Sequence, residues 1–476
     1  MSNSTSTSRR SFMRALGGLA AHAAAVPRQG LMLGTQLAGL AAMAQQSSHA
    51  ADLNGGYKAL VCVFLNGGSD THNWVVPIDT EGYAAYSKAR PDLAWPLARL
   101  QGIATPGQAA GRQLAMPVEL APLARWYNAG KASIVLNCGT LERPLTKAEY
   151  QTGAGSPRKL FSHNDQASVW QSLSTEGARS GWGGRMGDLL MAANAHPVFT
   201  AVSATGNAVF LTGQNVTQFQ VGADGLVTAG GINATSIYGA ARGSAALGRV
   251  LNPSTSDPLL AEYTRVLQRG LGANGLLQTA LGGTMVPHLP TTPVANGGGS
   301  TTLDKIGLAQ QLRTVLQMIA ANQALGMRRQ VFMVSMSGFD THANQMRDQP
   351  GHMAQVAGAI DYFLTSLQTL GLLNNVTMFT ASDFGRTLVS NGDGSDHGWG
   401  SHHFVAGGAV RGGTTLGRFP DLATGSADDI GSGRLLPAIG VSQLAASLGG
   451  WMGLSASEQV QVLPNLGNFG AGPALF

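Results

Sequence analysis

Carboxylate and imidazole side chains are concentrated in one stretch near the carboxyl terminus, TASDFGRTLVSNGDGSDHGWGSHHF at residues 380–404. Charged residues make up only 12% of the 476-residue chain, and eleven residues are histidine, so this density is unusual. The groups concerned fall within 21 positions and are Asp383, Asp393, Asp396, His397, His402 and His403. Such groups either decorate a solvated loop or converge as oxygen and nitrogen ligands of a metal ion.

Two further polar groups follow apolar runs elsewhere in the chain. Asp70 and His72 closely follow LVCVFLNGG, and Asp340 and His342 follow VFMVSMSGF. Asp383 follows VTMFTAS in the same way. Each aspartate alone is explained equally well as a helix cap, and an isolated Asp-x-His pair as a solvated turn. The three groups together favour a metal site or a strongly polar active site.

The apolar runs have the composition of buried β-strands. Because they are continuous, as in strands covered on both faces, strands are predicted at 58–68, 132–139, 329–338 and 374–382. Amphipathic helices are predicted at 257–279, 304–325 and 353–371. This alternation predicts an α/β fold with a doubly wound, mainly parallel sheet. The polar groups would then share the carboxyl edge of that sheet, where ligands bind.

Two segments depart from this rhythm. Residues 205–256 are rich in Gly, Thr, Asn and Gln, which predicts an inserted cap region or extra β-structure. Residues 283–302 are Pro-rich and then Gly-rich, which predicts a flexible surface loop. Cys62 and Cys138 both lie in apolar runs. An oxidising compartment would permit a bridge between them, and two buried free thiols are the slightly favoured alternative.

The start of the chain predicts export. Residues 8–14, Ser-Arg-Arg-Ser-Phe-Met-Arg, resemble a twin-arginine signal and precede apolar stretches at 15–26 and 31–44. We therefore expect a signal region at 1–50, an α/β domain at 51–476, a periplasmic or secreted location and the twin-arginine export machinery as a partner. A disordered basic tail or an uncut membrane anchor is the alternative.

The signal region also carries most of the positive charge. Removing the first 44 residues, which hold four arginines and no acid, lowers the formal net charge from +5 to +1. A balance so close to zero does not favour nucleic-acid binding. No stretch outside the signal approaches the ~18 apolar residues of a membrane span, so we expect no stable span once the signal is removed.

Four separated motifs carry a family resemblance. LNGGSDTHNWVVP, FSHNDQASVWQ, SMSGFDTHANQ and SDFGRTLVSNGDGSDHGWGSHHFVAGGAVRGG, behind a twin-arginine leader, resemble an exported bacterial family known as domain of unknown function 1501. That family is similar in turn to the alkaline phosphatase and sulfatase superfamily. The resemblance implies an alkaline phosphatase-like fold with Asp and His metal ligands at the carboxyl edge of the sheet.

The resemblance also implies a set of ligands. Asp70 matches the first metal aspartate of the superfamily, Asp340 with His342 matches its Asp/His pair, and Asp383 matches the aspartate of its Asp-His motif. The last histidine corresponds to His397 or His402.

One departure puts a second metal in doubt. Phe384 stands where the superfamily has a histidine, so either that metal is lost or another histidine substitutes for the missing ligand. The histidines considered for that place are His72, His163 and His403. Mixed carboxylate and imidazole ligation predicts a divalent metal, Zn²⁺ or Mn²⁺ ahead of Ca²⁺.

Two candidates exist for the nucleophile. Ser162 stands where a helix is expected to begin, the place of superfamily nucleophiles, although its spacing to Asp165 also matches a capping box. A water activated by the metal is the other. His163 and Asn73 are suited to hydrogen-bonding a tetrahedral anion. Arg386 either grips a sulfate or phosphate or anchors its loop through an ion pair.

Two functions follow from these features. The first is an exported metal-dependent hydrolase of sulfate or phosphate esters, acting on a small anionic ester or on a sulfated or phosphorylated polymer. The second is a non-catalytic exported protein of the same fold that binds surface polymers or partner proteins. The dense Asp/His edge favours the first, and Phe384 together with the uncertain nucleophile favours the second.

Overall fold

A mixed, mostly parallel sheet is the centre of the fold. The computed structural model describes residues 55–223, 236–237 and 239–476, so the expected twin-arginine signal lies outside the described residues. These residues belong to the unit 51–476. In spatial order the path of the sheet is β15 (Thr415–Leu416), β5 (Ala132–Gly139), β14 (Ser401–Gly407), β11 (Val376–Ser382), β1 (Lys58–Asn66), β10 (Arg329–Ser337), β6 (Ala201–Ser203) and β7 (Phe219–Gln220).

The direction of each strand decides which ends meet. β1 pairs in parallel with both β10 and β11, and β6 continues in parallel beyond β10. Within this path only β14 runs antiparallel to its neighbours, β11 and β5. The short β16 (Ile439–Gly440) pairs with β5. Three of the four predicted central strands are therefore adjacent and parallel, with their carboxyl ends at one edge.

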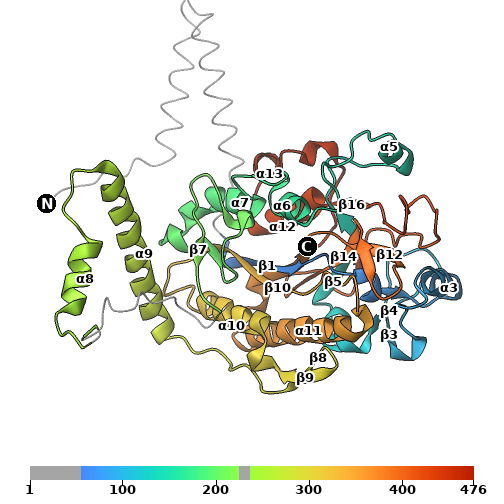
Figure 1. Cartoon of the computed structure of the whole chain (residues 1–476), viewed down its shortest axis with the longest axis horizontal. Helices are drawn as coiled ribbons and strands as arrows, with labels where there is room; N and C mark the ends of the chain where they lie inside the picture. The colour runs from blue at the N-terminus through green and yellow to red at the C-terminus, as the bar shows by residue number, and fades with distance from the viewer. Residues whose placement is uncertain (1–54, 224–235, 238) are drawn as a thin grey trace, which may run out of the picture. The chain divides into compact units, whose positions relative to one another are not determined.

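Helices cover both faces of the sheet, as Figure 1 shows. One face packs against α4 (Ala121–Asn128), α10 (Gly307–Ala320) and α11 (Gln345–Thr369). The other packs against α6 (His163–Ser172), α7 (Trp182–Leu190), α12 (Val441–Met452) and α13 (Ala456–Val462). Alternate residues of β1 enter the two cores, Val61 and Val63 on one side and Cys62 and Phe64 on the other. The predicted doubly wound α/β fold is confirmed.

Smaller elements surround this framework. A three-stranded sheet joins β2 (Val76–Pro77), β4 (Leu114–Pro117) and β3 (Leu100–Ile103), and a hairpin joins β12 (Arg386–Ser390) to β13 (Ser395–His397). The remaining helices are α3 (Thr80–Ala89), α5 (Lys147–Gln151), α8 (Gly243–Leu251) and α9 (Pro258–Gly282). Within 205–256 lie β7 and α8, while 224–235 and 238 are outside the described residues.

The segment predicted as a flexible loop at 283–302 contains ordered structure instead. A hairpin of β8 (Pro293–Asn296) and β9 (Gly299–Thr302) packs against α11. Its two turn residues, Gly297 and Gly298, have φ values of 48° and 85°. Positive φ at both central positions is what a tight two-residue hairpin requires, so the glycines that suggested disorder form a turn.

The two cysteines are separate. Cys62 and Cys138 are buried free thiols, and burial raises the pKa of both well above the usual value. The structure therefore matches the expectation of two buried free thiols and not that of a disulfide bridge.

Candidate functional site

Three aspartates follow the central strands at one edge of the sheet. Asp70, Asp340 and Asp383 come after β1, β10 and β11 respectively. In the strand register Asn66 is level with Ser337, and Leu65 with Ser382, so these three parallel strands end together. The topology therefore brings residues that are 270 and 313 positions from Asp70 in the sequence to the same edge.

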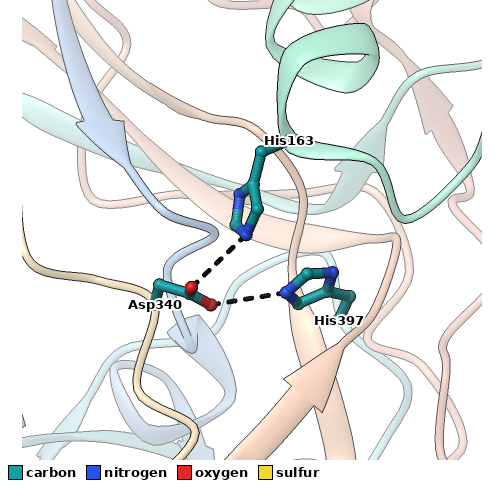
Figure 2. Close-up of side chains that lie close together, drawn as sticks. All are labelled: His163, Asp340 and His397. Carbon is teal, nitrogen blue, oxygen red and sulfur yellow. Dashed lines mark ion pairs between the residues drawn. The ribbon is translucent and has the colours of Figure 1, made fainter.

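The carboxylate of Asp340 is the meeting point of three imidazoles. Its oxygens lie 3.4 Å from His163 Nε2, 3.1 Å from His342 Nε2 and 3.4 Å from His397 Nε2. Figure 2 shows His163 and His397 reaching Asp340 from different elements, the start of α6 and the end of β13. Ligand atoms of His163, Asp340 and His397 lie within 4.8 Å of one another, which suits a metal ion.

Each of these imidazoles is oriented by a hydrogen-bond acceptor at its other nitrogen. His163 Nδ1 lies 2.8 Å from Asp383 Oδ2, and His397 Nδ1 lies 2.7 Å from the carbonyl oxygen of Phe161. His342 Nδ1 lies 3.3 Å from Asp396 Oδ1. Carbonyl and carboxylate oxygens only accept, so the proton resides on Nδ1 in each ring. In the neutral rings all three Nε2 atoms then present lone pairs, the usual arrangement of metal-binding histidines.

The converging lone pairs require a positive charge. Nε2 of His342 lies 2.9 Å from Nε2 of His397, so two lone pairs face each other unless a proton or a cation intervenes. Nε2 of His163 and Oδ1 of Asp383 are buried without a hydrogen-bond partner. A divalent cation would satisfy these nitrogens, and mixed imidazole and carboxylate ligation is of the kind that suits Zn²⁺ or Mn²⁺. The residues present therefore fit the metal that the sequence predicts.

The local electrostatics keep Asp340 ionised and shift the pKa values of two of the histidines in opposite directions. Burial would raise the pKa of Asp340, but the hydrogen bond and charge of Arg386 outweigh it, and the pKa is lowered. The hydrogen bond that His163 donates to Asp383 raises the pKa of His163. Burial lowers the pKa of His397. The site thus combines one firmly charged carboxylate with imidazoles of different proton affinity.

Backbone strain aims one of the acceptors. Phe161 has φ of 71°, a left-handed conformation that a bulky residue rarely adopts, and this turn directs its carbonyl oxygen to His397. Arg434 lies over the Phe161 ring at 4.9 Å and helps to hold it. Such strain persists only where surrounding structure enforces it, and it often accompanies functional sites.

Phe384, in place of the histidine expected from the superfamily, forms a wall of the site. Its ring centroid lies 4.8 Å from that of His163 and 4.7 Å from that of His397. Room for the ring comes from Gly68, where a Cβ would lie 2.4 Å from the Phe384 ring. Of the histidines considered as substitutes, His163 is the one that the fold brings to the group.

Arg386 supports the site from within the protein. Its side chain is fully buried, and Nη1 donates to Asp340 Oδ1 at 2.6 Å while Nη2 donates to the carbonyl oxygen of Ser395. A guanidinium so occupied is placed to orient Asp340 and the β12–β13 hairpin. The anchoring alternative for Arg386 matches these contacts better than a direct grip on a substrate.

Ser162 precedes the first residue of α6. Its hydroxyl donates to Asp165 Oδ2 at 2.8 Å, and its side chain makes no cap hydrogen bond to the helix backbone. The capping-box alternative is therefore not what the structure contains. The contact to Asp165 gives the hydroxyl a partner outside the histidine group.

The fold does not bring Asp70 to the histidine group. Its carboxylate is fully buried and accepts from Arg90 Nη1 at 2.9 Å and from the side-chain amide of Gln345. The superfamily resemblance had implied a metal at this aspartate. Here the guanidinium of Arg90 supplies the positive charge that offsets Asp70.

His402 also lies elsewhere. It is buried in β14, where its Nδ1 accepts from the backbone N–H of Asn137 at 3.0 Å and its ring stacks on Phe419. Its neighbours His72 and His403 are equally buried. Because charging a buried imidazole is costly, the pKa falls to about 4 for His72, to about 3 for His403 and well below normal for His402.

Two contributors to the site were not identified from the sequence. Asp396 stood in the dense stretch without an assigned role. The carbonyl oxygen of Phe161 has no sequence signal, because nothing in the residue type predicts a left-handed backbone there.

Among the helices of the described residues, none combines the length and the apolar composition that a membrane crossing requires.

Solved structures with some similarity include sulfatases and a phosphatase. Ps i-CgsB in complex with k-i-k-neocarrahexaose matches with 11% identity and a TM-score of 0.33, covering 86% of this chain and 74% of its own. The PsFucS1 sulfatase from Pseudoalteromonas sp. matches with 9% identity and a TM-score of 0.32, covering 91% and 73%. An alkaline phosphatase PafA mutant matches with 11% identity and a TM-score of 0.27, covering 70% and 64%. TM-scores this low decide neither fold nor chemistry.

Comparison with families gives a firmer result. No curated protein matches the sequence. One family model matches residues 57–461, which include every residue of the site described above, and it confirms the resemblance seen in the four motifs. The chain belongs to the family described as "Protein of unknown function (DUF1501)".

Proposed function

We propose that this protein is an exported, metal-dependent hydrolase of phosphate or sulfate esters. The observation that carries the proposal is the convergence of three Nε2 atoms on Asp340, each imidazole being fixed by an acceptor at its Nδ1. A divalent cation supplies a Lewis acid for the ester oxygens and lowers the pKa of water. His163, Asp340 and His397 would hold the ion.

The remaining groups have different tasks in this proposal. Asp383 orients His163, and Arg386 fixes the carboxylate of Asp340. His342, whose side chain is 44% exposed, is the most accessible of the three imidazoles. Its Nε2 would take the proton that the attacking water releases and pass it to the leaving alcohol. Asp396 holds its Nδ1–H. With Ser162 engaged by Asp165, activated water is the preferred nucleophile.

The test combines metal analysis with an ester screen. Purified protein exposed to Zn²⁺, Mn²⁺ or Ca²⁺ should retain about one ion per chain, because Arg90 already neutralises Asp70. Chromogenic phosphate and sulfate esters should be hydrolysed only by the loaded protein. His342→Gln should retain the ion and lower kcat about 100-fold or more. Retention of no metal by the wild-type protein would exclude the proposal.

The second candidate function is a non-catalytic binding protein. The observations that favour it are the contact of Ser162 with Asp165 and the internal pairing of Asp340 with Arg386. Under this alternative the protein would take up metal and bind sulfated or phosphorylated polymers without turnover. Stoichiometric metal with no hydrolysis of any ester, and with unchanged polymer recovered after incubation, would favour it over the hydrolase.

Export is part of the proposal and rests on residues 8–14 and the apolar stretches at 15–26 and 31–44 that follow them. A folded, metal-loaded chain suits the twin-arginine route, which carries folded proteins. Changing Arg9 and Arg10 together to lysine should leave the protein in the cytoplasm. The measurement is fractionation of cells that express the wild-type or the double-lysine chain, and equal export of both would contradict this part.

A further inference from the structure

Gln345 is a buried amide next to the two segments that carry most of the candidate site. It is the first residue of α11, and it is 0% exposed. The loop before it holds Asp340 and His342, and the second strand of the β12–β13 hairpin holds Asp396 and His397. Burying an amide is costly unless its hydrogen bonds are made, so the partners of Gln345 indicate what it holds together.

Both ends of this amide are fully engaged. Its Nε2 donates to Asp70 Oδ2 and, at 3.2 Å, to Gln349 Oε1. Its Oε1 accepts from Ser395 Oγ at 2.6 Å and from Thr341 Oγ1 at 3.1 Å. Because a carboxylate only accepts, the contact with Asp70 fixes which end of the amide carries the nitrogen. The hydroxyls of Ser395 and Thr341 therefore donate to Gln345.

These hydrogen bonds belong to a chain with a single direction. Arg386 Nε donates to Ser395 Oγ at 3.4 Å, and the Ser395 hydroxyl donates in turn to Gln345. The Gln345 amide then donates to Asp70. Hydrogen bonds aligned in this way polarise and strengthen one another. Arg386 also donates to Asp340 Oδ1 at 2.6 Å, so one continuous network connects the buried Asp70 with the carboxylate of the histidine group.

Backbone contacts around Gln345 join the same segments. Its N–H donates to the carbonyl oxygen of Asp393 at 3.0 Å, and the N–H of Ser395 donates to the carbonyl oxygen of Thr341 at 3.1 Å. At Gly394 a Cβ would lie 2.3 Å from that Thr341 oxygen, so only glycine permits this close approach. Two segments that are distant in the sequence are therefore held in contact beside the Gln345 amide.

The end of the network at Asp70 is firmly fixed. Asp70 is 2% exposed, and its carboxylate also accepts from Arg90 Nη1 at 2.9 Å. Arg90 donates in addition to the carbonyl oxygens of Thr387 and Leu388 in β12, at 3.0 and 2.8 Å. The side chain of Asp340, at the other end, is 45% exposed. A buried network whose members are all hydrogen-bonded is rigid, so it can fix the position of a more exposed carboxylate.

We propose that Gln345 is a positioning residue of the candidate metal site. It connects the buried Asp70 to Arg386, and thereby fixes the carboxylate that Arg386 holds. This role rests on the proposed function, because it concerns the ion that His163, Asp340 and His397 would bind. A glutamine that served the fold alone would contribute to stability and leave the affinity for metal unaffected, so the two roles have different consequences.

The first measurement is the metal affinity of the full-length protein, by competition with a chromogenic chelator. The ion is Zn²⁺, Mn²⁺ or Ca²⁺, whichever the wild-type protein retains, and circular dichroism confirms that each variant is folded under the conditions used. Gln345→Met keeps the approximate volume of the side chain and removes its hydrogen bonds. It should weaken metal binding about tenfold, the lower end of the ~10–100-fold range for residues that support metal ligands.

Gln349→Met is the matched control. Gln349 is also buried in α11, at 2% exposed, and donates to the backbone carbonyl oxygen of Asp70 at 2.7 Å. Among the described residues it has no hydrogen bond to the β12–β13 hairpin. Gln349→Met should therefore lower stability and leave the metal affinity unchanged. An equal loss of affinity in Gln349→Met and Gln345→Met would overturn the positioning role.

Ser395→Ala tests the same network with a smaller change, and it carries the test if Gln345→Met does not fold. It should weaken metal binding by a similar factor, and the double variant should bind no more weakly than the weaker single variant, because both changes break one connection. Unchanged affinity in the single variants, or effects that multiply in the double variant, would overturn the positioning role and leave the proposed function standing. Retention of none of the three ions by the wild-type protein would overturn both.

Discussion

Two groups of three histidines face different surroundings although some of their members are close in the sequence. His163, His342 and His397, the front group, have side chains 34%, 44% and 23% exposed. His72, His402 and His403, the rear group, are at most 2% exposed. Only five positions separate His397 from His402. The front imidazoles converge on a carboxylate, whereas the rear ones are buried as neutral rings. Burial and hydrogen-bond partners therefore decide which histidines can bind a ligand, more than their distance along the sequence does.

The aspartates show the same contrast. Asp70 and Asp340 follow neighbouring parallel strands. Asp70 is fully buried and paired with Arg90, whereas the side chain of Asp340 is 45% exposed and faces three imidazoles. One of these carboxylates is enclosed in the fold, and the other, although it pairs with Arg386, remains accessible at the edge of the sheet. The predictions below separate the two roles, from the largest expected effect to the smallest.

Acid should destabilise the metal-free protein mainly through the rear group. Burial lowers the pKa of His72 to about 4, that of His403 to about 3 and that of His402 well below its usual value, so the unfolded chain binds more protons below about pH 6.5. The free energy of unfolding should fall by about 1 kcal/mol per pH unit for each of these imidazoles. Urea titrations between pH 7 and pH 4.5 measure the slope.

One histidine of the front group, His163, contributes with the opposite sign. The raised pKa of His163 adds stability below its ordinary pKa, and this contribution is lost as the pH rises through the folded value. One such group cannot balance three of the other kind. His402→Leu should make the acid slope shallower by about 1 kcal/mol per pH unit. A stability that stays constant from pH 6.5 to pH 5 would contradict the assignment of neutral buried rings.

Removing Arg90, the partner of the buried Asp70, should lower the free energy of unfolding more than breaking an exposed ion pair does. Arg90→Ala leaves the carboxylate of Asp70 buried without its charge partner and should lower the free energy of unfolding by about 3–5 kcal/mol. Arg125→Ala, which breaks an ion pair whose arginine is 65% exposed, should cost at most about 1 kcal/mol. Urea denaturation compares the two, and equal effects would show that the Arg90 pair is not a structural element.

Changes in the front group should act on metal and leave the fold intact. Asp383→Asn disturbs the orientation of His163 and should weaken metal binding about 10–100-fold, and Asp340→Asn should weaken it further by removing a ligand. Competition with a chromogenic chelator measures both affinities. His288→Ala, an exposed histidine, is the control that should change nothing. If Asp383→Asn has the larger effect, Asp383 is itself a ligand.

The smallest effect is expected at Ser162. Its hydroxyl contacts Asp165 and none of the front imidazoles, so Ser162→Ala should leave metal content unchanged and lower stability by only about 1 kcal/mol, the usual contribution of one hydrogen bond. If ester hydrolysis occurs, the variant should retain it. Loss of hydrolysis with normal metal content would restore Ser162 as the nucleophile.

Much of the framework could be predicted because it depends on local pattern. The four apolar runs became β1, β5, β10 and β11 within two residues of their predicted bounds, and the helices α9, α10 and α11 fall on the predicted amphipathic segments. Placement of Asp340, Asp383 and His342 after strand ends followed from the same pattern. The hairpin at β8–β9 was missed, because glycine and proline are shared by disordered loops and tight turns.

What the sequence by itself determined is the set of strands and therefore the acids and histidines that could reach one edge of the sheet. The tertiary structure alone decided their roles. The Asp383 partner of His163 is 220 positions away, the Asp340 partner of Arg386 is 46 away, and the carbonyl acceptor of His397 is 236 away. A strand covered on both faces buries His402 and His403 alike, while the end of the β12–β13 hairpin leaves His397 at the open edge. Hydrogen-bond partners and exposure depend on contacts between distant segments, and residue type and spacing do not encode these directly.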